Sequence, residues 1–293
     1  SMKTFKQLEI FETVSIYDGA EFTEYDIPKR GKTAIIFISQ SGETKDLHNC
    51  IQIAKHHNVV TIGVVNVPDS LIAREVNCGV YLNSGREVAV ASTKSFTNQC
   101  VVLTIIAIWF SQNKRTCVEK RRSIIADLRN LSFQLQIMLN KQENNTKIKD
   151  FAKELSGSKS IFLLGKGKSE AIAHEGALKL KEIAYIHSEG YSSSALKHGT
   201  FALIENGIPV IIIDIDSENS SINKTVKKEV EARGARTLVI KDSGEGDLNI
   251  EKNKTFGGLM ANVYIQLISY YIALEMGHDP DFPKNLAKVV TVD

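Results

Sequence analysis

Apolar residues along the chain follow two alternating patterns, short continuous runs and longer stretches with a helical period. The short runs are rich in β-branched residues and cover residues 33–39, 59–65, 160–164, 209–215 and 237–240. Such runs are typical of strands covered on both faces, as in parallel sheets. Between them, residues 44–57, 169–185 and 219–233 carry apolar residues at the spacing of amphipathic helices. The alternation predicts an α/β fold of mainly parallel sheets flanked by helices.

The order of a strand, a polar loop and a helix occurs twice, at residues 38–51 and 163–180. Two long helical stretches, 92–113 and 117–140, lie between these repeats. The polar segment 141–149 that follows them is the best candidate for a linker. Because a length of 293 residues also fits two domains, the sequence predicts two similar domains, residues 1–145 and 146–293.

Composition and charge exclude several classes of protein. The chain has 36 Lys and Arg against 34 Asp and Glu, a net charge of +2, whereas nucleic-acid binders usually carry a concentrated basic surface. The longest apolar stretch, residues 101–110, is far shorter than the roughly 20 residues that span a bilayer. The first residues show no signal peptide. The four cysteines have no CxxC spacing, which favours free thiols. We therefore expect a cytoplasmic protein that binds neither nucleic acid nor membrane.

One polar loop has the composition of an anion site. It follows a strand, opens a helix and consists of Ser39, Gln40, Ser41, Gly42, Glu43 and Thr44. Free N–H groups and the helix dipole attract negative charge at such a place. No GxxxxGK[ST] or GxGxxG pattern surrounds the loop, so a nucleotide is not implied. The loop predicts a monophosphate site, and the alternative is a helix cap without a ligand.

Three other features carry possible chemistry. Glu175, Lys179 and Glu182 are spaced to lie along one helix face, although a solvated surface would show the same spacing. His198 stands near a turn, where it is either structural or suited to proton transfer near neutral pH. The hydroxyl-rich turn at residues 90–94 is by itself a helix cap. No metal-ligand cluster is evident among the seven histidines.

Taken together, five segments resemble the isomerase part of the glutamine–fructose-6-phosphate aminotransferases, which is built from two sugar isomerase (SIS) domains. They occur in the family's order and read SQSGET (39–44), VASTK (90–94), EGALKLKE (175–182), HSEG with LKHG (187–199) and PKNLAKVVTVD (283–293). SQSGET alone is shared by many SIS proteins, but the combination is specific. The resemblance implies a flavodoxin-like, three-layer α/β/α fold in each domain and no cofactor or metal.

The resemblance also assigns roles to individual residues. It implies that the sugar 6-phosphate is bound by Ser39, Gln40, Ser41 and Thr44, and the sugar itself by Val90, Ser92 and Ala287. Glu182 matches the acid/base that moves a proton between C1 and C2, and Lys179 matches a lysine that assists it. His198 matches the histidine of ring opening, which in a homodimer reaches the neighbouring subunit's site. Lys288 matches the lysine that forms a Schiff base with the open-chain ketose.

The implied reaction is that of a glutamine–fructose-6-phosphate transaminase (isomerising). Fructose 6-phosphate becomes glucosamine 6-phosphate with ammonia from a glutaminase domain, which has no counterpart in this sequence. The first SIS strand and its CGTS-type loop also have no counterpart, Ala195 replaces an acidic residue and Thr200 replaces a proline. The rival hypothesis is a non-catalytic SIS module that binds a sugar phosphate for regulation. Regulatory modules usually need only the phosphate loop, whereas this sequence also has Glu182, His198 and Lys288.

Overall fold

The structure, a computed structural model that describes residues 2–242, 244 and 246–288, divides the chain into two compact units. Unit 1 runs to Arg121 and includes the tail from Ala287, and unit 2 spans Arg122–Leu286. This division differs from the predicted one at residues 145 and 146. The reason is the long helix α5 (Val118–Asn140), most of which lies in unit 2. Its Asp127 side chain accepts hydrogen bonds from the backbone and hydroxyl of Thr255 in the same unit.

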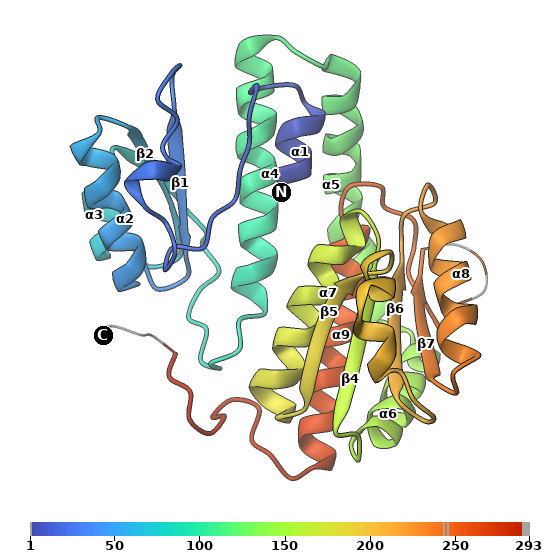
Figure 1. Cartoon of the computed structure of the whole chain (residues 1–293). Helices are drawn as coiled ribbons and strands as arrows, with labels where there is room; N and C mark the ends of the chain where they lie inside the picture. The colour runs from blue at the N-terminus through green and yellow to red at the C-terminus, as the bar shows by residue number, and fades with distance from the viewer. Residues whose placement is uncertain (1, 243, 245, 289–293) are drawn as a thin grey trace. The chain divides into compact units, whose positions relative to one another are not determined.

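Unit 1 contains a three-stranded parallel sheet in the order β1-β2-β3 (Figure 1). Its strands are β1 (Ala34–Ser39), β2 (Val60–Val65) and β3 (Cys78–Tyr81). Its helices are α1 (Met2–Gln7), a 3-10 turn (Glu24–Asp26), α2 (Lys45–His56), α3 (Leu71–Glu75) and α4 (Lys94–Lys114). Apolar residues of α2 and α3 pack on one face of the sheet around Phe37 and Val65. Helix α4 contacts β2, and α1 packs against α4.

Unit 2 contains a five-stranded parallel sheet in the order β5-β4-β6-β7-β8. Its strands are β4 (Ser160–Gly165), β5 (His187–Ser192), β6 (Pro209–Asp214), β7 (Arg236–Lys241) and β8 (Leu248–Asn249). Its helices are α5 (Val118–Asn140), α6 (Gln142–Leu155), α7 (Lys168–Lys179) with a π-helical turn (Leu180–Ala184), 3-10 turns (Ala195–His198, Thr200–Leu203), α8 (Ser220–Glu231) and α9 (Gly257–Glu275).

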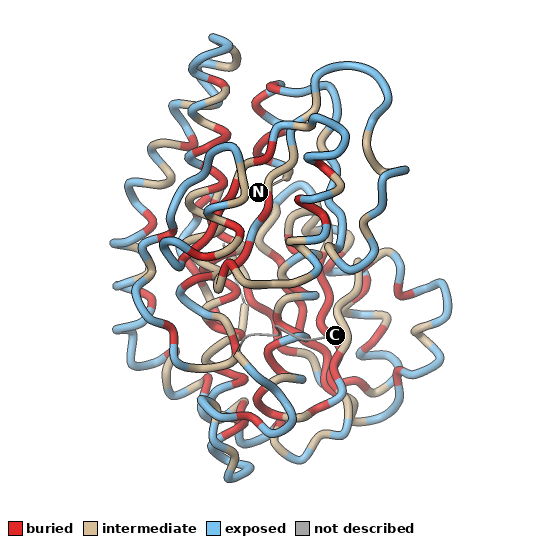
Figure 2. Tube along the Cα trace, turned by 90° about the vertical axis from the view of Figure 1, so that its left-hand side faces the viewer, coloured by how far each residue is buried: buried red, intermediate tan, exposed pale blue. Residues whose placement is uncertain are grey.

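The sheet of unit 2 is covered on both faces, as the apolar strand runs predict. Val226 and Val230 of α8 pack on one face against Phe162 and Leu164. On the other face α7 lies against β4 and α9. Buried positions accordingly gather along the strands and the inner helix faces (Figure 2). The three-layer α/β/α fold is confirmed.

Two segments correct the sequence analysis. The predicted linker 141–149 lies almost entirely in α6, which buries one side chain per turn at Asn144, Ile148 and Ala152. The sequence did not predict this helix, because one of its buried positions holds a polar residue. This residue is Asn144, whose side-chain amide donates a hydrogen bond to the Tyr264 hydroxyl.

The sequence pattern did not predict helix α9, because Asn262, Gln266 and Ser269 interrupt its apolar residues. Among the helices that the structure describes, only α9 has the length and composition of a membrane span, but 61% of it is buried within the fold. It has the burial of a core helix.

Candidate active site

The phosphate loop joins the carboxyl end of β1 to the start of α2, as predicted. Its hydroxyls organise its own backbone: Ser39 Oγ accepts from Gly42 N at 3.0 Å and lies 3.1 Å from Thr44 Oγ1. Ser41 Oγ accepts from Glu43 N at 3.2 Å. The loop therefore curls around its hydroxyl groups at a helix N-terminus, the arrangement that attracts an anion.

The first residues of α3 hold this loop in place through hydrogen bonds. Gly42 O accepts from Ile72 N, and Glu43 Oε1 accepts from Leu71 N, both at 2.9 Å. Gly42 has φ +71°, and a Cβ added there would lie 2.0 Å from Ser70 Oγ. Only glycine fits both this dihedral angle and this space, so the loop's shape is fixed by the protein itself.

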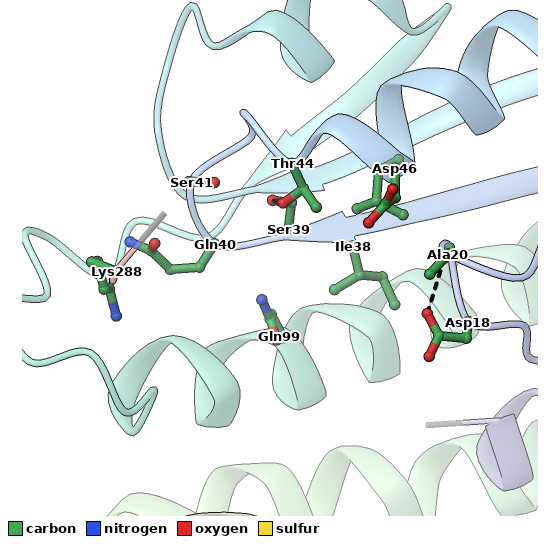
Figure 3. A pocket seen from close by; sticks show the side chains of 12 residues that line it. Asp18, Ala20, Ile38, Ser39, Gln40, Ser41, Thr44, Asp46, Gln99 and Lys288 are labelled. Atoms are coloured by element: carbon green, nitrogen blue, oxygen red, sulfur yellow. Dashed lines mark hydrogen bonds between the residues drawn. The ribbon is translucent and has the colours of Figure 1, made fainter. Parts of the chain in front are cut away.

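A cavity of about 360 Å³ opens beside the loop within unit 1 (Figure 3). It is lined by Asp18, Gly19, Ala20, Ile38, Ser39, Gln40, Ser41, Thr44, Asp46, Leu47, Gln99 and Lys288. All four residues assigned to the 6-phosphate therefore line one cavity, and the tail lysine lines it too. The structure thus brings the predicted phosphate site and the predicted Schiff-base lysine together.

Glu87 is a site residue that the sequence analysis missed. Its side chain is 3% exposed, and its Oε2 accepts from Lys288 Nζ at 2.9 Å. The same carboxylate accepts from the backbone N–H groups of Thr93 at 2.9 Å and Ser95 at 3.3 Å, in the first turn of α4. A signal was present, since an acidic residue shortly before the hydroxyl-rich turn at 90–94 suits a helix N-terminus.

These contacts determine the protonation of Glu87. Burial alone would raise its pKa, but hydrogen bonds from Ser95, Thr93 and Lys288 outweigh it and lower the pKa to about 2. The carboxylate is therefore ionised at neutral pH. It fixes a negative charge between α4 and the tail.

In unit 2, Glu175, Lys179 and Glu182 share one helix face, which confirms the predicted spacing. Lys179 Nζ lies 2.5 Å from Glu182 Oε2 and 3.5 Å from Glu175 Oε1. Lys179 is 3% exposed, so this trio is not the solvated surface that the spacing alone allowed. Burial raises the pKa of the Glu175 carboxyl, the Lys179 ammonium opposes this, and the Glu182 carboxylate adds to it.

Glu182 lies in the π-helical turn that follows α7. Such turns are rare and are often found at functional sites. The turn ends at Tyr185, which has φ +55°. The Tyr185 hydroxyl accepts from the backbone N–H of Lys284 at 2.7 Å. Tyr185 therefore holds the last part of unit 2, at Lys284, against the turn that carries Glu182.

The remaining predicted residues are placed as follows. Val90 O lies 3.4 Å from Lys288 Nζ, and Ser92 Oγ donates to Glu87 at 3.3 Å. Ala287 is exposed next to Lys288. His198 is exposed at the end of a 3-10 turn in unit 2, and its role across a dimer stays a prediction. Across the described part of the chain, no three His, Cys, Asp or Glu residues are grouped to hold a metal ion.

The sequence and the fold are similar to those of known proteins. The profile of the SIS domain family matches residues 12–109 and 154–275. A protein of Acanthamoeba polyphaga mimivirus described as a probable glutamine–fructose-6-phosphate aminotransferase (isomerizing) is 42% identical over 288 residues, 96% of this chain and 47% of that protein. The human glutamine–fructose-6-phosphate aminotransferase (isomerizing) 2 is 36% identical over 284 residues, 94% of this chain and 41% of that protein.

Among solved structures, the C-terminal domain of glucosamine-fructose-6-phosphate aminotransferase from Francisella tularensis superposes with a TM-score of 0.82 at 31% identity, covering 89% of this chain and 76% of that chain. The glucosamine-6-phosphate deaminase of Thermotoga maritima has a TM-score of 0.75 at 23% identity over 99% of this chain and 85% of that chain, a likeness of fold alone. The chain spans less than half the length of the two aminotransferases it matches in sequence.

Proposed function

The chain belongs to the SIS domain family, and from that premise we propose that it is the sugar-phosphate isomerase part of a glutamine–fructose-6-phosphate aminotransferase. In this proposal it converts fructose 6-phosphate to glucosamine 6-phosphate with ammonia from a glutaminase domain, and to glucose 6-phosphate without ammonia. The relatives named above support the assignment, because their similarity runs over almost the whole chain. The cytoplasm is the compartment we propose for it.

One observation carries the proposal: Lys288 and the phosphate loop line the same cavity. A phosphate held at Ser39–Thr44 would fix the sugar at the end remote from its reacting carbons. Binding energy from such a remote group orients the substrate for reaction. The primary amine of Lys288 then faces the carbonyl end, where an imine makes the neighbouring C–H bond more acidic.

Glu182 supplies the proton transfer in this scheme. Isomerisation moves one proton from C1 to C2, so the base must accept the proton and return it to the adjacent carbon. A carboxylate suits this task, and Lys179, bound to Glu182 Oε2, can balance the charge that changes during the transfer. His198 opens the sugar ring. No step needs a metal ion or an organic cofactor.

Turnover distinguishes the proposal from a regulatory SIS module. The purified chain is incubated with fructose 6-phosphate, with and without ammonium, and glucose 6-phosphate and glucosamine 6-phosphate are followed by NMR. We expect glucose 6-phosphate in both samples and glucosamine 6-phosphate only with ammonium. Tight binding of fructose 6-phosphate without either product would support the regulatory module instead.

The phosphate loop makes its own prediction. A Ser41→Ala/Thr44→Ala double variant should bind fructose 6-phosphate roughly 10²–10⁴-fold more weakly by calorimetry, since each of the two charge-assisted hydrogen bonds contributes about 1.5–3 kcal/mol. Thr97→Ala is the matched control, because its exposed hydroxyl donates only to the Thr93 carbonyl. Unchanged affinity in the folded double variant would remove the phosphate from this loop.

The proposed homodimer is supported by the surface of α4. Ile105 and Trp109 are 46% and 58% exposed, and large exposed apolar side chains on one helix favour an interface. The dimer also determines how defective variants combine. A His198→Ala chain mixed with a Glu182→Gln chain forms hybrid dimers in which one site has both residues intact.

Mixing the two inactive variants at equal concentration should therefore restore about a quarter of the wild-type activity, because half of the dimers are hybrids and half of their sites are intact. Activity is measured after exchange of subunits, with each variant alone as the control. No recovery in a mixture that sedimentation shows to be dimeric would contradict the shared site.

A further inference from the structure

Glu87 lies outside both the phosphate loop and the trio of Glu175, Lys179 and Glu182, yet it contacts Lys288 directly. Lys288 Nζ donates to Glu87 Oε2 at 2.9 Å and to the Val90 carbonyl at 3.4 Å. The side chains of Glu87 and Lys288 are 3% and 22% exposed. Screening by water is weak at such a place, so the pair interacts more strongly than a surface ion pair.

The carboxylate is held by the protein and not by the tail. Oε1 accepts from the backbone of Thr93 and Ser95, and Oε2 accepts from the hydroxyls of Ser95 and Ser92. Four of its hydrogen bonds thus come from the turn and first residues of α4, where the helix dipole also favours negative charge. The negative charge stays in place whether or not Lys288 is bound to it.

Other charged groups near the pocket do not share this role. Asp18 and Asp46 line the same cavity but lie on the opposite side of Ser39 from Lys288 (Figure 3). Lys94 is turned away and donates to the Arg86 carbonyl. Within the described part of unit 1, Glu87 is the group whose charge contacts the lysine nitrogen.

We propose that Glu87 is the positioning residue of Lys288: its carboxylate holds the lysine nitrogen beside the phosphate loop until a sugar phosphate is bound. The inference rests on the proposed function, in which Lys288 forms an imine. For that reaction the ammonium must lose one proton to solvent. The neutral amine then adds to the C2 carbonyl, and the adduct loses water to give the imine.

A carboxylate at hydrogen-bond distance opposes the first of these steps, because an opposite charge within about 4–6 Å favours the charged form. Nζ must therefore leave Glu87 before it can react. Glu87 therefore keeps the amine in place and opposes its reaction for as long as the two side chains are paired. Lysine reactivity is restrained in the empty pocket, where an unprotected amine would react with other carbonyl compounds.

The test uses Glu87→Gln, which retains an oxygen acceptor for α4 but removes the charge. Two readouts are followed against pH on the Lys288 peptide by mass spectrometry. The first is acetylation without sugar, and the second is borohydride trapping with fructose 6-phosphate. Labelling at neutral pH should become roughly tenfold faster in both readouts, because the neutral amide no longer opposes loss of the lysine proton.

Two controls separate charge from shape. Glu87→Asp keeps the charge, so the dependence of its labelling on pH should follow that of the wild type even if total labelling falls. Glu75→Gln removes a carboxylate of unit 1 that lies outside the cavity lining and pairs with Lys55, so it should leave both profiles unchanged.

The outcomes are distinct. Profiles of Glu87→Gln that coincide with the wild type, or that fall equally at every pH, would overturn the inference and leave Glu87 as a helix cap. A shifted acetylation profile without any trapped sugar in the wild type would support the inference and contradict the proposed imine. Trapping in the wild type with no shift in either profile would support the proposed imine and contradict the inference about Glu87.

Discussion

Glu182→Gln is expected to lower the rate of fructose 6-phosphate isomerisation by about 10²–10⁴-fold, the usual contribution of a positioned general base. The amide has nearly the same shape and its oxygen can still accept the hydrogen bond from Lys179, but it cannot take up a proton. Because the phosphate loop lies in unit 1 and Glu182 in unit 2, the affinity for the sugar phosphate should change little. Glucose 6-phosphate formation measures the rate, and calorimetry measures the affinity.

Glu175→Gln is the matched control for this variant. Glu175 lies 3.5 Å from the same lysine nitrogen and carries a raised pKa from burial, but the proposed reaction gives it no proton to move. It should keep most of the activity. Exchange of solvent deuterium into the sugar should also disappear only in Glu182→Gln. Equal losses in the two variants would mean that the trio acts through its charge and not through one base.

The parts of the fold that the sequence predicted are those where local pattern and burial agree. Strand β6 is apolar up to its last residue, Asp214, and is buried at all six positions, so its pattern could be recognised directly. Strand β5 could not, because its residues, including Ser188 and Gly190, are mostly polar or small. Its position comes from pairing with β4 and from the close approach of α7.

Gly190 shows how close that approach is. A Cβ added at Gly190 would lie 2.5 Å from the backbone nitrogen of His174 in α7. The sequence shows a glycine but not the helix that requires it. Contacts of this kind depend on the tertiary fold and have no periodic signature along the chain.

The candidate site also has a part that the sequence predicts and a part that only the fold reveals. The phosphate loop could be predicted because its strand, hydroxyls and helix start are consecutive residues. Glu87 could not be linked to Lys288, because 201 positions separate them in the chain. The burial of Lys179 was likewise open from spacing alone. Sequence identifies the chemical groups, and the fold decides which of them are paired.

Lys288→Arg is expected to abolish the trapped adduct and to reduce turnover by a large factor. Arginine keeps a positive charge for Glu87, but a guanidinium stays protonated throughout the working pH range and cannot form an imine. Tail position and pocket charge are therefore retained while the nucleophile is lost. Borohydride treatment with fructose 6-phosphate, followed by peptide mass analysis, measures the adduct directly.

Lys284→Arg is the control, since Lys284 lies in the same tail with its Nζ 4.5 Å from the centre of the Tyr185 ring. It should trap sugar on Lys288 as the wild type does. Lys179 is the competing nucleophile, but two carboxylates hold its nitrogen, whereas Lys288 has one. A label on Lys179, or full activity in Lys288→Arg, would contradict the imine and reduce the tail to a cover for the pocket. A label confined to Lys288 would identify the reacting amine, because the substitution changes the nucleophile and leaves the charge in place.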